Sequence, residues 1–168
     1  MVGSGRARPL TAVNGYLVIV SCGDEKVWKR HPHAGPTAAR DAYASSPFKK
    51  SRQYAEHFGQ QWLVLSANYG FIEPEFIIRE NYNVSFYDAN AVSATTLREQ
   101  VAAKDLAQFT TVGVLGSETY WRRVVEAFDG ASAVLRHVNG NVSFAPSFHK
   151  LINTLIATDT PFREENAP

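Results

Sequence analysis

Four short strand-like runs, three of them almost wholly apolar, with helical stretches between them, restrict this chain to a small set of folds. The runs lie at residues 16–22, 62–66, 111–115 and 133–138. Continuous β-branched runs of this length are typical of strands that are buried on both faces of a parallel sheet. Strands that alternate with helices build α/β domains in three layers. We therefore predict an α/β fold in three layers, with a mainly parallel, four-stranded central sheet.

Amphipathic segments between these runs predict the helices. The expected helices cover residues 37–44, 48–58, 93–104, 117–128 and 147–157. Ser93 has the side chain of a helix N-cap, and Ser46-Pro47 is expected to separate the first two helices. The face formed by Tyr120, Trp121, Val124, Val125 and Phe128 is interpreted as core. The long segment 71–87 is expected to be irregular.

The length of 168 residues corresponds to about one domain. We expect a flexible basic arm at 1–14, a single α/β catalytic domain at 15–158 and a polar tail at 159–168. The sequence has no apolar run long enough for a membrane span, and its first 14 residues lack the apolar stretch of a signal peptide. One cysteine, Cys22, excludes an internal disulfide and favours a cytoplasmic setting. No zinc-ligand spacing occurs, so we expect neither a metal ion nor a cofactor.

The charge is unevenly distributed along the chain. Residues 1–57 hold nine Lys/Arg and four Asp/Glu, whereas the remainder holds eight and twelve. Such a basic excess favours an anionic partner such as a nucleic acid, although a solvated basic face explains it equally well. If the partner is DNA, Lys49, Lys50, Arg52 and the arm residues Arg6 and Arg8 are the candidate phosphate contacts.

Polar, glycine-bearing segments follow all four predicted strands. They are residues 21–24, 66–70, 116–117 and 139–141. Ligands of open α/β sheets bind at the carboxyl ends of the strands. We therefore expect the four segments to converge on one rim, where Ser117, at the start of a helix, is a further candidate anion contact.

The segment Ser21–Lys26 supplies the first candidate catalytic groups. Gly23 allows backbone N–H groups to approach a ligand, and Asp24 is a carboxylate suited to activating water. Lys26 is a candidate for stabilising negative charge, and Glu80 is a second candidate carboxylate. The alternative is an ordinary turn with surface charges.

Cys22 and the histidines have structural alternatives. A thiol at a strand end is a potential nucleophile if His31 or His33 acts as its base, but a lone cysteine there is more often packed. We place Cys22 among the substrate contacts. The pair His31-x-His33 lacks a third metal ligand.

Amide and aromatic side chains suit the recognition of a nucleobase. An Asn reads a base edge and a Tyr stacks on its face, whereas the alternative for the segment 66–71 is a simple turn. The candidate substrate contacts are Gly23, Arg40, Tyr43, Ser66, Asn68, Tyr69, Tyr82 and Asn83. Neither a Walker loop nor a GxGxxG fingerprint is present.

The segments SCGDEKVW, GPTAARDAYASSPFKKSRQYAEHFG, WLVLSANYGFIEPEFII and ENYNVSFYD resemble a family of short bacterial and phage α/β proteins known only as a domain of unknown function. The family pattern reads roughly SCGKxK, ARDLY-x-x-PxFRK, LSAKYGL and a Tyr-Asp step, and the match covers about residues 16–130. More distantly, the chain is similar to the core domain of archaeosine synthases and to the uracil-DNA-glycosylase-like fold. It also resembles a phage-defence DNA glycosylase that removes glucosylated hydroxymethylcytosine.

This chain departs from the family pattern at three positions. Asp24 and Asn68 stand where lysines are common, and Asn83 stands where an aspartate is common. The water-activating string GQDPY of uracil-DNA glycosylases is also absent.

The resemblance implies a DNA glycosylase that hydrolyses the N-glycosidic bond of a modified base, leaves an abasic site and acts in antiviral defence. A Schiff base formed by a lysine would instead couple excision to strand cleavage. Two other functions stay open: an enzyme that acts on a free nucleotide, nucleoside or modified tRNA base, and a non-catalytic module that binds nucleic acid.

Overall fold

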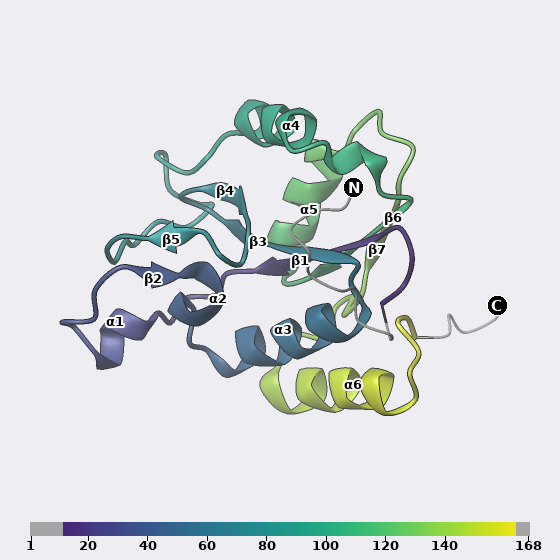
Figure 1. Ribbon diagram of the computed structural model, residues 1–168, viewed down its shortest axis with the longest axis horizontal. Coiled ribbons are helices and arrows are strands. Elements are labelled where there is room, and N and C mark those ends of the chain that lie inside the picture. The colour runs from purple at the N-terminus through teal and green to yellow at the C-terminus, as the bar shows by residue number, and fades with distance from the viewer. Residues whose placement is uncertain (1–11, 164–168) are drawn as a thin grey trace.

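A sheet of five strands forms the centre of the computed structural model, in which residues 12–163 are described (Figure 1). The strands are β1 (Tyr16–Ser21), β3 (Gln61–Ser66), β4 (Gly70–Ile72), β6 (Thr111–Leu115) and β7 (Val134–His137), in the spatial order β4-β3-β1-β6-β7. All neighbouring pairs are parallel except β3 and β4. The four predicted parallel strands are thus confirmed, whereas the prediction of only four strands is wrong. The short β4 was missed because Gly70, at φ +79°, turns the chain straight back along β3.

Helices cover both faces of this sheet, which confirms the three layers (Figure 1). One face carries α3 (Ser46–Phe58) and α6 (Ala145–Ala157), and the other carries α4 (Ala94–Ala103) and α5 (Glu118–Ala127). Successive side chains of β1 point to opposite faces. Val18 and Val20 pack with the first layer, and Leu17 and Ile19 pack with the second. A 3₁₀ turn, Leu106–Gln108, precedes β6.

The helix predicted at 37–44 is confirmed for only half of its length. The chain instead forms a short strand β2 (Thr37–Ala38), paired with β5 (Ile77–Ile78), and a single turn α2 (Ala39–Ala42). The N–H groups of Ala39 and Arg40 donate to the carbonyl oxygens of Phe76 and Pro74. The segment that was expected to be irregular thus contains β4 and β5. A further short helix, α1 (Val27–Arg30), lies in the preceding loop.

Helix α3 begins two residues earlier than predicted. The Ser45 hydroxyl accepts a hydrogen bond from the Phe48 N–H at 3.2 Å, and Pro47 occupies the first turn, where its missing N–H costs nothing. Ser46-Pro47 therefore starts the helix and does not interrupt it. Ser93 caps α4 as predicted.

Two further predictions, the burial of Val125 and the frayed polar tail from residue 159, differ from the structure. Val125 is exposed, because it lies about 100° around α5 from the buried Val124. Residues 159–163, predicted as part of a polar tail, pack on the domain: the Tyr54 hydroxyl donates to the Pro161 carbonyl at 2.6 Å, and Phe162 contacts Tyr16 edge-on. The rest of that tail and arm residues 1–11, with Arg6 and Arg8, lie outside the described residues.

The connections from β1 place β3 on one side of it and β6 on the other. At such a switch of direction the loops after the two neighbouring strands diverge and leave a crevice between their carboxyl ends. A ligand-binding site is therefore expected between the carboxyl ends of β1 and β6. No helix within residues 12–163 is both long and apolar enough to span a bilayer.

Candidate functional site

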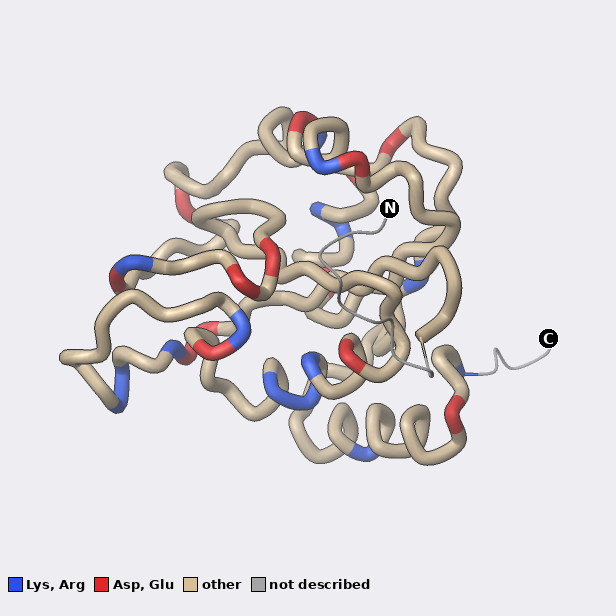
Figure 2. The backbone as a smooth tube through the Cα atoms, in the orientation of Figure 1, with Lys and Arg blue, Asp and Glu red and all other residues tan. Residues whose placement is uncertain are grey.

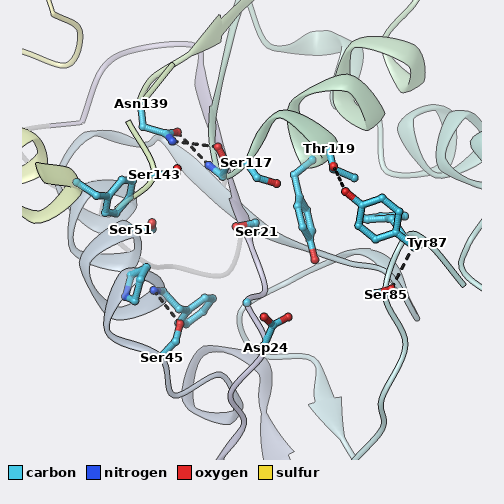
Figure 3. A pocket seen from close by; sticks show the side chains of 17 residues that line it. Ser21, Asp24, Ser45, Ser51, Ser85, Tyr87, Ser117, Thr119, Asn139 and Ser143 are labelled. Carbon is cyan, nitrogen blue, oxygen red and sulfur yellow. Dashed lines mark hydrogen bonds between the residues drawn. The ribbon is translucent and has the colours of Figure 1, made fainter. Parts of the chain in front are cut away.

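A pocket of about 400 Å³ opens at the carboxyl ends of β1, β6 and β7 (Figure 3). The helices α3, α5 and α6 all start beside it. Its lining residues are Ser21, Gly23, Asp24, Ser45, Pro47, Phe48, Ser51, Ser85, Phe86, Tyr87, Gly116, Ser117, Thr119, Tyr120, Asn139, Ser143 and Phe148. The expected convergence of polar strand ends is thus confirmed for three of the four strands.

Asp24 is the carboxylate of this pocket. Gly23 adopts φ +74°, a left-handed conformation, and a Cβ atom there would lie 3.0 Å from the Ser45 hydroxyl oxygen. This glycine turns the chain off β1 and directs the next side chain into the pocket (Figure 3). The Asp24 side chain is exposed and forms no hydrogen bond or ion pair with any other residue of the described range. It is therefore available to a water molecule or a ligand.

Asn139 fixes the opposite wall. Its buried side-chain oxygen accepts from the Gly116 N–H, and its amide nitrogen donates to the carbonyl oxygens of Gly116 and Val142, each at 3.0 Å (Figure 3). These bonds join the loops after β6 and β7. Gly116 itself leaves no room for a side chain, because a Cβ atom there would lie 2.9 Å from Ser21.

Hydroxyl groups dominate the polar lining of the pocket. Six serines and one threonine line it: Ser21, Ser45, Ser51, Ser85, Ser117, Ser143 and Thr119. Ser117 and Phe144 occupy the N-cap positions of α5 and α6, and no side chain of the described residues caps either helix. The first N–H groups of α5 are therefore left for an oxygen-rich or anionic ligand, whereas the first turn of α6 offers fewer, because Pro146 has no N–H.

Aromatic rings supply the apolar part of the lining. Phe86, Tyr87, Tyr120 and Phe148 contribute to the pocket walls. Phe86 and Tyr120 meet edge to face, with ring centroids 5.1 Å apart. A pocket with apolar walls and a few convergent polar groups is typical of a small-molecule or nucleobase site.

The loop after β3 does not line the pocket. The Ser66 hydroxyl accepts hydrogen bonds from the N–H groups of Asn68 and Tyr69, both at 3.1 Å, and also bonds the Tyr82 hydroxyl at 2.8 Å. The Tyr82 hydroxyl bonds Tyr43 as well. This buried network closes the end of β3, which is why the fourth predicted strand end does not join the rim.

Lys26 packs against this network and not in the pocket. Its side chain is buried and lies over the Tyr82 ring. Burial lowers the pKa of the Lys26 ammonium, although the nearby Cys22 and Asp24 act in the opposite direction. Burial likewise raises the pKa values of Tyr43 and Tyr82.

Cys22 lies behind the pocket wall. Its buried sulfur is 3.3 Å from the hydroxyl of Tyr120, which does line the pocket. Burial raises the pKa of the thiol, so the thiolate that a nucleophile requires is disfavoured. This geometry favours the interpretation of Cys22 as a packed cysteine over its interpretation as a nucleophile.

Several other predicted residues lie away from the pocket. Glu80 lines a separate, smaller cavity beside Trp28 and Arg79. Arg40 forms ion pairs with Asp41 and Glu75. The remaining predicted substrate contacts are the exposed Asn83, the half-buried Asn68, and Tyr69, whose ring packs between Phe76 and Tyr82.

The side chains predicted to contact phosphate differ in how free they are to bind a ligand. Lys49 is exposed in the first turns of α3, next to the lining residue Phe48. Lys50 donates to Asn153 at 2.8 Å. Arg52 pairs with Asp41 and Glu56, and Figure 2 shows basic and acidic positions interspersed along the backbone.

Sequence reasoning missed much of the pocket lining. The residues that it did not single out are Ser45, Ser51, Ser85, Phe86, Tyr87, Thr119, Ser143 and Phe148. Tyr120 was interpreted purely as core, yet it is half-buried with its ring at the pocket. No local signal marked Tyr87, because its loop reaches the pocket through packing with distant elements. Within the part of the chain that the structure describes, no three His, Cys, Asp or Glu side chains gather as metal ligands would.

Residues 17–141 match the family of unknown function DUF6884. This chain belongs to that family. It is also 35% identical over 116 residues to the uncharacterized protein YfjM of Bacillus subtilis (strain 168). The aligned region covers 68% of this chain and 77% of the Bacillus protein. No solved structure shows significant similarity to the chain. The residues that match the family include Asp24, Gly116 and Asn139, so the pocket lies almost entirely within the family domain.

Proposed function

We propose that this protein is a DNA glycosylase that hydrolyses the N-glycosidic bond of a modified base and leaves an abasic site. The observation that carries the proposal is the unpaired carboxylate of Asp24 in an aromatic-walled pocket at the β1–β6 crevice. The resemblance to uracil-DNA-glycosylase-like proteins, and to a phage-defence glycosylase, supports the same chemistry. It also suggests antiviral defence as the biological setting.

In this mechanism a single nucleotide leaves the base stack and its base enters the pocket. The Asp24 carboxylate accepts a proton from a water molecule as the water oxygen bonds to C1′ of the sugar. The bond between C1′ and the base nitrogen breaks, and its electron pair leaves with the base. The negative charge of Asp24 also stabilises the cationic character that the sugar develops.

The leaving base requires hydrogen-bond donors. The serine hydroxyls of the pocket, and the N–H groups at the start of α5 beside the lining residues Ser117 and Thr119, suit this role. Lys26 does not line the pocket, which favours direct hydrolysis over a Schiff base formed by that lysine.

The size of the pocket favours a bulky base. A volume of about 400 Å³ is within the range of sites that enclose drug-sized ligands. A base that carries a sugar, such as glucosylated hydroxymethylcytosine, is therefore the substrate class that we propose. The serine hydroxyls suit the hydrogen bonds of such a sugar.

The test is incubation of the purified protein with unmodified, uracil-containing and glucosyl-hydroxymethylcytosine DNA, followed by alkali. We expect strand breaks only in the glucosylated DNA, because alkali cleaves the chain at abasic sites. Intact DNA in all three samples would overturn the proposal. If the protein then releases a base from free nucleosides or from tRNA, the enzyme of the second hypothesis replaces it, whereas salt-sensitive binding alone indicates a binding module.

A further inference from the structure

Two aromatic side chains are far more exposed than the other large apolar residues of the described chain. Tyr87 is 86% exposed and Phe144 is 82% exposed, and the next value, that of Val134, is 58%. Single exposed apolar residues are common on protein surfaces. The two most exposed aromatic residues are notable here because both adjoin the same pocket.

Tyr87 and Phe144 lie at opposite sides of the pocket. Tyr87 lines it, and its hydroxyl bonds the Thr119 hydroxyl of α5 at 3.0 Å, which fixes the direction of the ring. Phe144 directly follows the lining residue Ser143 at the start of α6. Figure 3 shows Ser143 and Tyr87 on opposite sides of the opening. Helices α5 and α6 cover opposite faces of the sheet, so the two rings belong to different layers.

Phe144 is not placed to enclose a ligand inside the pocket. Tyr87 keeps most of its surface in solvent, and Phe144 is absent from both core clusters and makes no ring contact within residues 12–163. A free nucleotide that fills the pocket would reach Tyr87, which lines it, but would leave Phe144 uncovered. A strand with one nucleotide inserted would instead keep its neighbouring nucleotides at the two sides of the opening.

We propose that Tyr87 and Phe144 stack on the bases that flank the inserted nucleotide, so that the ligand of this site is a nucleic-acid strand and not a free nucleotide. Stacking of bases on aromatic rings tolerates any sequence, because every base has a π face. The pair holds the strand on both sides of the pocket while the inserted base is bound. This inference rests on the proposed function for the role of the pocket.

The test compares binding of a labelled single-stranded oligonucleotide to wild type, Tyr87→Ala and Phe144→Ala. Each ring removed should weaken binding by about 5- to 150-fold, the range for one base stacked on an aromatic side chain. Tyr87→Phe keeps the ring and should bind within about threefold of wild type. Val134→Ala, an exposed apolar residue on β7, is the matched control and should bind as wild type does.

A second ligand separates stacking from damage to the pocket. Binding of dCMP should be unchanged in Phe144→Ala, because the mononucleotide has no flanking bases and Phe144 does not line the pocket. Equal losses for dCMP and for the strand in Phe144→Ala would overturn the inference, as would unchanged strand binding in both alanine variants or no strand binding by wild type. Since this assay needs no base excision, stacking without excision would leave the inference standing and reject the glycosylase, and excision without stacking would do the reverse.

Discussion

The ammonium group of Lys26 lies 4.3 Å from the centroid of the Tyr82 ring. The ring is held in place because its hydroxyl bonds Ser66 and Tyr43. Lys26 forms no ion pair or hydrogen bond through its ammonium with the other described residues, so its charge is offset by the π face of Tyr82 and by the nearby Cys22 and Asp24. Because burial outweighs these effects and lowers the pKa of Lys26, this lysine makes stability depend on pH.

Lys26→Met should therefore change the pH profile of stability. Between the lowered folded pKa of Lys26 and the unfolded value of about 10.4, the unfolded chain holds a proton that the native protein lacks. Stability contributed by this site rises with pH across that interval and is lowest below it, where folding buries the charge. The free energy of unfolding of wild type minus that of the variant, from urea melts at several pH values, should rise over this interval.

Lys29→Met is the control for that measurement, because Lys29 is exposed on α1. Its difference from wild type should not vary with pH. A flat or falling difference for Lys26→Met would show that the buried amine is not deprotonated more easily in the native state.

Asn139→Ala should destabilise the protein. The substitution leaves the N–H of Gly116 and the C=O of Val142 without their partner, whereas the C=O of Gly116 keeps the ring nitrogen of His137 at 2.9 Å. We expect a loss of about 2–4 kcal/mol in the free energy of unfolding, measured by urea denaturation. The exposed Asn141→Ala should stay within about 0.5 kcal/mol of wild type. Equal stabilities for the two variants would mean that the link between the β6 and β7 loops is not needed.

Cys22 should resist alkylation in the native protein. The sulfur is buried against Tyr120 and burial raises the pKa of the thiol, so iodoacetamide meets little accessible thiolate. Labelling followed by mass spectrometry should be at least about tenfold faster in urea than in buffer. Equally fast labelling in both conditions would restore Cys22 as a candidate nucleophile.

Lys49 and Arg52 should differ in the salt dependence of DNA binding. Lys49 is exposed, whereas the Arg52 guanidinium pairs with Asp41 and Glu56. For single-stranded DNA, Lys49→Ala should reduce the slope of log K against log salt by about 0.7, the contribution of one phosphate contact. Arg52→Ala should leave the slope unchanged and cost about 1 kcal/mol of stability or less. A reduced slope in Arg52→Ala alone would reverse this assignment.

The parallel strands β1, β3 and β6 were predictable because most of their residues are buried, which leaves a nearly continuous apolar run in the sequence. Thr111–Leu115 was predicted with its exact bounds for this reason. The short strands β2, β4 and β5 leave no such run, since two or three residues form a strand only through a partner elsewhere in the chain. Pairing with β5 also made residues 37–38, the start of the predicted helix at 37–44, into the strand β2.

The site was predictable to the extent that topology alone determines it. Asp24 and Ser117 follow adjacent parallel strands, so their meeting follows from strand order. Tyr87 and Ser143 come from loops whose paths depend on packing, and no local pattern places them at the pocket. Glu80 lies only two residues from Tyr82, yet it lines a separate cavity while Tyr82 bonds Ser66 and Tyr43, because chain proximity does not determine side-chain direction in an irregular segment.

Asp24→Asn tests the proposed catalytic role most directly. Single-turnover excision from glucosyl-hydroxymethylcytosine DNA should slow by about 100-fold or more, since an amide cannot accept the proton of the attacking water. Affinity for the same DNA should stay within about threefold of wild type, and Asp129→Asn, an exposed carboxylate after α5, should be fully active. An Asp24→Asn protein that excises the base at the wild-type rate would contradict the assignment of Asp24 as the catalytic carboxylate.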